Sequence, residues 1–148
     1  MVKPLPKPVK QKKKPNRSVS KKRRSIKTLI NEADKIFSLY IRRRDGGSLY
    51  SGKKEQTQCS HLVSRGYWKY RWCPENCITL TYAEHIYGWH SGKMGEYIFW
   101  LKETYPEKYA FFEMAVKDIH TSTNKRPSIS EMEGIISHLK ELLASLPE

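Results

Sequence analysis

The sequence has only three cysteines and no apolar run near the roughly 18 residues that a membrane-spanning helix needs. Three cysteines without a regular spacing (Cys59, Cys73 and Cys77) exclude a disulfide framework and predict free thiols in a reducing compartment. The N-terminus has lysines but no apolar stretch behind them, which is not typical of a secretory signal. We therefore predict a cytoplasmic protein, in the host cytoplasm if the chain is viral, with no membrane partner.

Acidic residues are missing from the first 24 positions, which contain eleven Lys and Arg and four prolines. The net charge is +13, yet residues 25–148 hold 17 Lys and Arg against 15 Asp and Glu, so the excess charge lies in the tail. This composition predicts a disordered basic tail that binds nucleic acid; a solubilising tail or a localisation signal is the alternative. The phosphate contacts expected of the tail lie at its last four positions, Lys21, Lys22, Arg23 and Arg24.

The sequence of residues 25–148 predicts one domain of the α+β class, which is mainly α-helical. Apolar residues recur every three or four positions after Ser25, a suitable N-cap, and the pattern stops at the Gly46-Gly47 pair. A β-hairpin should follow, with strands at 48–50 and 57–63 and a turn within 52–55. A short strand or turn is expected from Cys77 to Leu80, and then a helix that passes through His85.

Three further helices are predicted at about 93–104, 106–120 and 130–146. Pro106 suits the first turn of the second of these helices, and Ser130 with Glu133 predicts a capping box for the last. The last helix is amphipathic, so its apolar face packs in the core or forms the interface of a homodimer.

A histidine, an asparagine and a second histidine follow one another between the predicted hairpin and the next helix (His61, Asn76 and His85). This order is typical of nucleases of the ββα-metal (HNH) type. The alternative is structural, because a histidine in a strand and an asparagine before a turn commonly have no chemical role. The loop at 64–75 mixes basic and aromatic residues, Lys69 among them, which suits contact with a nucleic-acid backbone or stacking on bases.

Four short segments, in order, resemble the phage NinG/Rap family of recombination nucleases, which are zinc-containing HNH proteins. Residues 36–45 (IFSLYIRRRD) resemble the family's first helix, VFSxYIRLRD, and residues 60–65 (SHLVSR) resemble G-H-F-I-x-R. Residues 71–76 (RWCPEN) resemble R-[WY]-D-x-x-N, and residues 95–105 resemble the G-E/N-x-x-Y…L…Y that opens the C-terminal helices. The resemblance covers roughly residues 25–146. It implies a small HNH-like core, at about 48–92, packed with an N-terminal helix and C-terminal helices.

The resemblance also implies roles for the polar residues. His61 would be the general base, because histidine ordinarily titrates near neutral pH, and Asn76 would orient it. His85 would ligate one divalent metal ion, Mg²⁺ or Mn²⁺, at the scissile phosphate. Arg65 would bind that phosphate through its planar fork, with Arg71 as the second candidate.

A second protein ligand for the metal is not evident from the sequence. Ser60 stands directly before His61, where HNH sites usually carry an acidic ligand. His90 is available, but it lies five residues after His85, which is about 140° round an α-helix. We therefore do not expect these two histidines to share a metal ion.

The family's two C-x-x-C knuckles, which hold a structural zinc, are missing. Their positions correspond to Ser48, Ser51, Thr81 and Glu84. A serine hydroxyl stays protonated and is a poor zinc ligand, so we predict no structural zinc. In its place we expect aromatic packing, by Tyr50, Trp68, Trp72 and Tyr82.

Two functions of different classes are therefore expected. The first is a metal-dependent endonuclease that cuts branched or structured DNA, such as a Holliday junction or a flap, in phage recombination. The second is a catalytically inactive protein that binds structured DNA on a degenerate HNH scaffold, which the loss of the knuckle cysteines favours. A third class, an RNA- or ribosome-associated protein, would depend on the basic tail alone.

Overall fold

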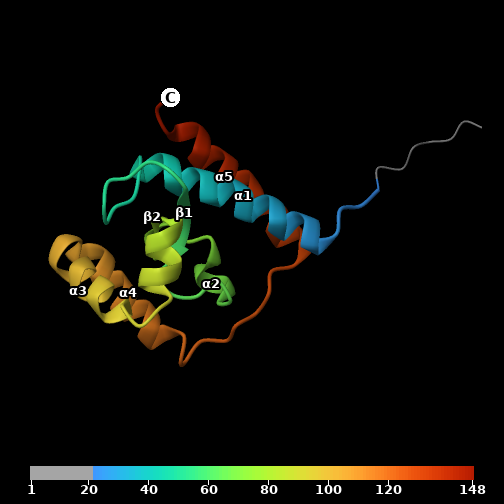
Figure 1. Ribbon diagram of the computed structural model, residues 1–148. Coiled ribbons are helices and arrows are strands. Elements are labelled where there is room, and N and C mark those ends of the chain that lie inside the picture. Colours follow the sequence, from blue (N-terminus) through green and yellow to red (C-terminus); the bar gives the residue numbers. More distant parts are fainter. Residues whose placement is uncertain (1–21) are drawn as a thin grey trace, which may run out of the picture.

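The computed structural model describes residues 22–148, and the predictions for the first 21 residues, Lys21 included, lie outside the described part. Within residues 22–148 the chain is mainly helical with one small antiparallel sheet, as the sequence predicts. Figure 1 shows three layers: helices α1 (Ile26–Asp45) and α5 (Ile129–Ser145) run side by side on one side of the sheet, and α3 (Met94–Thr104) and α4 (Pro106–Asp118) lie on the other.

The long helix α1 begins and ends where its sequence signals predict. The Ser25 side chain accepts a hydrogen bond from the backbone N–H of Thr28 (3.2 Å), which satisfies one free donor of the first turn. Gly46 follows the helix with a φ of 69°, a left-handed conformation that favours glycine. The buried stripe of α1 packs on α5 and on the sheet, and it consists of Leu29, Ala33, Phe37 and Ile41.

The sheet pairs β1 (Thr57–His61) with β2 (Cys77–Thr81), so the predicted hairpin partner at 48–50 is wrong. Residues 49–51 form a turn instead, in which the Ser48 hydroxyl accepts hydrogen bonds from the backbone N–H groups of Tyr50 and Ser51. A serine that bonds to its own following backbone competes with strand pairing.

Strand β2 is buried along its whole length, and its two faces serve two cores. Cys77 faces α1 and α5, and the Thr79 hydroxyl on the same face donates to the carbonyl of Ile41 in α1 (3.3 Å). Ile78 and Leu80 point the other way, into a core that α3 contributes to. The alternation of residues along a strand thus produces the layered arrangement.

The end of α1 is fastened to β2 by an arginine and an aspartate. The Arg44 guanidinium donates to the carbonyls of Pro74 and Cys77, at 2.8 Å each, and to the Asp45 carboxylate. Asp45 accepts a further hydrogen bond from the backbone N–H of Thr79 (2.8 Å). Arg44 therefore has a structural role, and among residues 42–44 the side chain most open to solvent is that of Arg43.

The connections between the main elements are short helical turns. Helix α2 (Trp68–Arg71) and the 3₁₀ turn η1 (Pro74–Asn76) lie between the two strands, and the π-helical turn η2 (Glu84–Trp89) follows β2. Helices α3 and α4 lie where they are predicted. No helix within residues 22–148 is long and apolar enough to cross a membrane.

Helix α5 begins earlier than predicted, because its capping box is formed by Ser128 and Glu131 rather than by Ser130 and Glu133. Both pairs have the same three-residue spacing. The earlier pair adds two residues to the helix and packs Ile129 against the α1–α5 core, which favours it.

Candidate active site

Some of the polar residues that the sequence singles out meet at a cavity of about 620 Å³ between α1, β1 and the π turn η2. Three of the predicted site residues line it, namely His61, Arg65 and His85. His90, which the helical geometry disfavoured, lines it as well, together with the carboxylate-bearing Asp34 of α1.

His61 is the last residue of β1, and its ring is held in one tautomer. Its Nε2 lies 2.8 Å from the backbone carbonyl of Arg71. A carbonyl only accepts hydrogen bonds, so Nε2 carries the hydrogen and the lone pair is on Nδ1. Burial lowers the pKa of His61, and the nearby Arg65 cation acts in the same direction, so the ring is neutral at pH 7. A neutral, oriented imidazole can accept a proton from water.

The Asn76 side chain hydrogen-bonds to the loop that holds His61 rather than to His61 itself. Its side chain is fully buried, and its Oδ1 accepts from the backbone N–H of Val63 (2.8 Å). Its Nδ2 donates to the carbonyls of Val63 (2.9 Å) and Tyr70 (3.1 Å). The asparagine therefore ties together both ends of the loop that carries the Arg71 carbonyl, and orients His61 through that loop.

His85 and His90 face each other across the π turn, with 2.9 Å between their Nε2 atoms. The expectation that they diverge is wrong, because the chain here is not an α-helix. The backbone N–H of His90 bonds to the carbonyl of His85, five residues earlier, at 3.0 Å. A π turn takes more residues per turn than an α-helix, so residues five apart lie on the same face.

Close packing around a glycine accompanies this wide turn. A side-chain carbon on Gly88 would overlap the ring of Tyr97 in α3, so only glycine fits there without a shift. Trp89, next to it, is buried in the core on the α3 side of the sheet. The turn is therefore wedged between β2 and α3, and the sequence carries no local signal for it.

Gln58 of β1 sets the tautomer of His85. Its Oε1 lies 2.8 Å from Nδ1 of His85, and an amide oxygen accepts, so Nδ1 donates and Nε2 keeps its lone pair. Burial, followed by electrostatic repulsion from the neighbouring basic groups of His90, His61 and Arg65, lowers the pKa of His85 to about 4. Histidines that bind metals usually donate their second N–H in this way, so the His85–His90 pair suits a metal ion.

The basic residues predicted to bind phosphate are placed differently from one another. Arg65 is exposed at the cavity, whereas Arg71 is turned to Asp34 by two hydrogen bonds of 3.0 and 2.6 Å. Lys69 pairs with Asp118 (2.7 Å), away from the cavity. The described residues of the tail, Lys22, Arg23 and Arg24, are exposed, and Arg24 pairs with Glu32.

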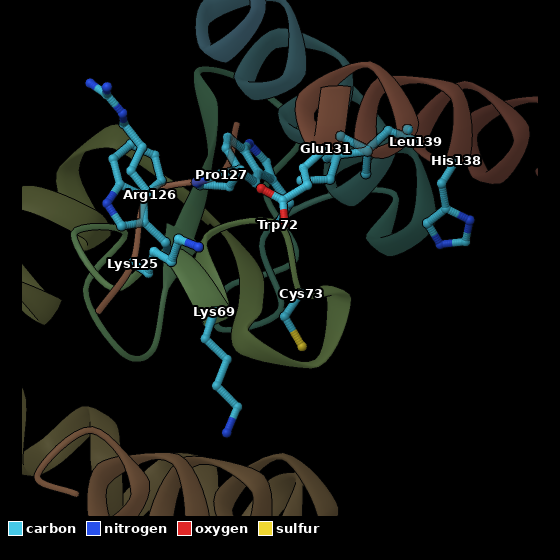
Figure 2. A pocket seen from close by; sticks show the side chains of 12 residues that line it. Lys69, Trp72, Cys73, Lys125, Arg126, Pro127, Glu131, His138 and Leu139 are labelled. Atoms are coloured by element: carbon cyan, nitrogen blue, oxygen red, sulfur yellow. The ribbon is translucent and has the colours of Figure 1, made fainter. Parts of the chain in front are cut away.

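A second hollow, of about 600 Å³, lies between α5, residues 68–73 of the loop at 62–76 and residues 125–127 (Figure 2). Trp72 lies at its centre, with Lys125 and Arg126 on one side and Glu131 on the other. Trp72 is half-buried, so it is both the predicted core residue and part of this surface. Aromatic and cationic side chains around one hollow provide a place for a nucleic-acid base to stack.

Hydrogen bonds connect the positions where the resemblance places the zinc knuckles. The Ser48 hydroxyl donates to the Glu84 carboxylate (2.5 Å), which also accepts from the backbone N–H of Thr81 (2.9 Å). Burial opposes the charge of Glu84, but hydrogen bonds from Ser48, Ser51 and Thr81 offset this effect and lower its pKa. Of the predicted aromatic support, Tyr50 stacks on Tyr97 (4.5 Å between ring centres) and Tyr82 lies edge-on to Tyr87 (6.5 Å), and both side chains are partly exposed.

Gln58 and His90 are side chains of the candidate site that sequence reasoning did not select. Gln58 meets His85 across 27 residues of sequence, and His90 meets it through the π turn, so neither contact has a local sequence signal. Comparisons of this chain with models of protein families, with curated proteins and with solved structures find no match.

Proposed function

We propose that this protein is a metal-dependent DNA endonuclease of the HNH (ββα-metal) type. The observation that carries the proposal is the convergence of a neutral, oriented His61, the His85–His90 pair and Arg65 on one cavity. Two further features support it. The order of β1, β2 and the helical turn η2 resembles that of a ββα element, and the Ser48–Glu84 contact joins two positions where the resemblance places the family's knuckles.

The residues of the cavity divide the chemistry of phosphodiester hydrolysis among them. His61 takes the proton of the attacking water on Nδ1, because Nε2 is occupied by the Arg71 carbonyl. Arg65 binds a non-bridging phosphate oxygen and offsets the charge that develops there. Asn76 keeps the Arg71 carbonyl in place, so that the base points at the water rather than into the loop.

The donors available at His85 and His90 fit a divalent ion of the first transition row. A bound ion would neutralise the scissile phosphate and stabilise the leaving oxygen. Two imidazole nitrogens suit such an ion better than Mg²⁺, which prefers oxygen ligands. Of the two metals predicted from the resemblance, the pair therefore favours Mn²⁺.

Branched DNA is the substrate that the two hollows suit best. A junction or flap offers a duplex phosphate beside unpaired bases. The cavity at His61 would take the phosphate, and the hollow around Trp72, which residues of the same loop also line, would take an unpaired base. The basic residues before α1 would add phosphate contacts that carry no sequence preference. A homodimer, which would place two such cavities on one junction, remains part of this proposal.

A catalytically inactive DNA-binding protein is the second candidate. The observation that favours it is Ser60, which is fully buried, so the position before His61 supplies no ligand to the cavity. A site with only two protein ligands binds a metal ion weakly, and a scaffold that has lost its metal would still hold DNA.

The test is cleavage of a labelled four-way junction, a flap and a plain duplex in Mn²⁺ and in Mg²⁺. We expect the wild type to cut a branched substrate, and His61→Ala to lose about 100-fold or more of the rate while it binds DNA as before. His120→Ala replaces an exposed histidine in the turn after α4; it is the matched control and should keep the wild-type rate. Binding without cutting by the wild type in either metal would leave the inactive DNA-binding protein.

A further inference from the structure

Two cysteines converge on His61 from the two strands of the sheet. The strand register places His61 opposite Cys77, and Cys59 lies two residues before His61 on the same face of β1. The two sulfur atoms and a ring nitrogen of His61 all lie within 4.8 Å of one another. Cys59 and His61 also line the cavity, whereas Cys77 is buried behind them.

The three groups have the chemistry and nearly the spacing of a zinc site. Zinc binds thiolates at about 2.3 Å and imidazole at about 2.0–2.1 Å, so tetrahedral ligand atoms lie roughly 3.5–4 Å apart. Small rotations of the two cysteine side chains would therefore bring the three atoms around one ion. The cavity offers an approach from the side of Cys59 and room for a water molecule as the fourth ligand.

The His61 ring is already arranged as a metal ligand. Its Nε2–H donates to the Arg71 carbonyl, which is the outer hydrogen bond that metal-bound histidines usually make. The lone pair on Nδ1 is thus the one available to a metal ion. In the proposed nuclease the same lone pair accepts the proton from water, so the two uses exclude each other.

We propose that Cys59, His61 and Cys77 form a site for a thiophilic metal ion such as Zn²⁺, separate from the His85–His90 pair, and that its occupation inhibits the enzyme. The inhibition rests on the proposed nuclease function, but the binding does not. The site is also separate from the knuckle positions, because Ser48, Thr81 and Glu84 form their own hydrogen-bonded cluster.

Binding is tested with Co²⁺, which replaces Zn²⁺ and gives a near-ultraviolet charge-transfer band only when thiolates ligate it. We expect the band in the reduced wild type, its displacement by one equivalent of Zn²⁺, and its loss in Cys59→Ser and Cys77→Ser. Cys73→Ser is the matched control, since this third cysteine hydrogen-bonds to Glu75 outside the cluster, and it should keep the band. Cys59 is only half-buried, so its variant tests the site even if replacement of the buried Cys77 prevents folding.

The double variant His85→Ala/His90→Ala separates the two metal sites. It should keep the cobalt band, because imidazoles without thiolates do not produce one. A reduced wild-type protein without the band, or a band that persists in Cys59→Ser, would overturn the proposal. The reductant in every sample prevents a Cys59–Cys77 disulfide from hiding the thiols.

The inhibitory consequence is measured as a ratio, the rate of Mn²⁺-dependent cleavage without Zn²⁺ over the rate with it. We expect this ratio to fall at least tenfold in Cys59→Ser relative to the wild type, and to stay at the wild-type value in Cys73→Ser. A protein that gives the cobalt band but cuts no DNA would contradict the nuclease and leave the metal site. A protein that cuts DNA but gives no band would contradict the metal site and leave the nuclease.

Discussion

Replacement of Asn76 by alanine is the change that most directly tests how the candidate site is held together. The variant removes an amide that bonds to three backbone groups of the loop at 62–76. One backbone N–H and two carbonyls, contributed by Val63 and Tyr70, lose their partner. Asn76 has no exposed surface, so water does not reach these groups without a rearrangement of the loop.

The expected loss of stability is about 3–5 kcal/mol. Each buried polar group left without a partner costs about 1–3 kcal/mol, and a rearrangement of the loop lets water reach some of the three. Domains of this size are stable by about 5–15 kcal/mol, so the change removes a large share of the total. The Arg71 carbonyl would also lose its fixed position, and with it the orientation of His61.

The loss of stability can be measured by urea unfolding monitored through tryptophan fluorescence, because Trp68 and Trp72 lie in the affected loop. Asn124→Ala is the matched control. Asn124 holds the same loop from outside, through the backbone N–H of Trp68 (2.9 Å) and the carbonyl of Gly66 (3.0 Å), but it is exposed. Water replaces its hydrogen bonds, so its loss should cost about 0.5–1 kcal/mol. Equal costs for the two asparagines would refute the reasoning.

Two further predictions concern the π turn and the packing of α4. Gly88→Ala should lower the free energy of unfolding, measured in urea, by about 1–3 kcal/mol, because the added methyl group overlaps the Tyr97 ring. Gly92→Ala is the control: its methyl group meets open space, so the free energy of unfolding should change by less than about 0.5 kcal/mol. The hydrogen bond from Lys69 holds the pKa of Asp118 at about 2, below its ordinary 3.8, so its contribution to stability is present above about pH 4 and is lost as the pH falls towards 2. The stability advantage of the wild type over Asp118→Asn should shrink over that range, and an advantage independent of pH would contradict the ion pair.

The helices could be predicted well from the sequence because their signals are local. Ser25 and Gly46 bracket α1 with a cap and a left-handed stop, and α3 and α4 show their apolar faces at helical spacing. The sheet could not be predicted in the same way. Its strands are joined by a loop that a buried asparagine holds in place, and the nearer partner at 48–50 is lost to a serine turn.

The site could be predicted in part for a similar reason. His61, Asn76 and His85 stand out by residue type and order, but their partners depend on tertiary structure. The periodicity of an α-helix predicts His90 on a different face from His85. In the fold a π turn brings the two histidines together, and Gly88 within that turn packs against the Tyr97 ring, a contact between distant residues that the sequence does not reveal. Arg71 is predicted to bind phosphate because of its guanidinium group. In the fold this group forms an ion pair with Asp34.

The layered arrangement of the sheet has a consequence for how the site opens. An isolated pair of strands is marginally stable in water, so β1 and β2 depend on the helices that cover both of their faces. Local unfolding of the strands therefore requires that α1 and α5, or α3 and α4, first separate from the sheet. The strands cannot open from one end alone. Helix α5 contributes no side chain to the cavity, yet its packing against α1 and Cys77 helps to hold in place the strands that carry His61.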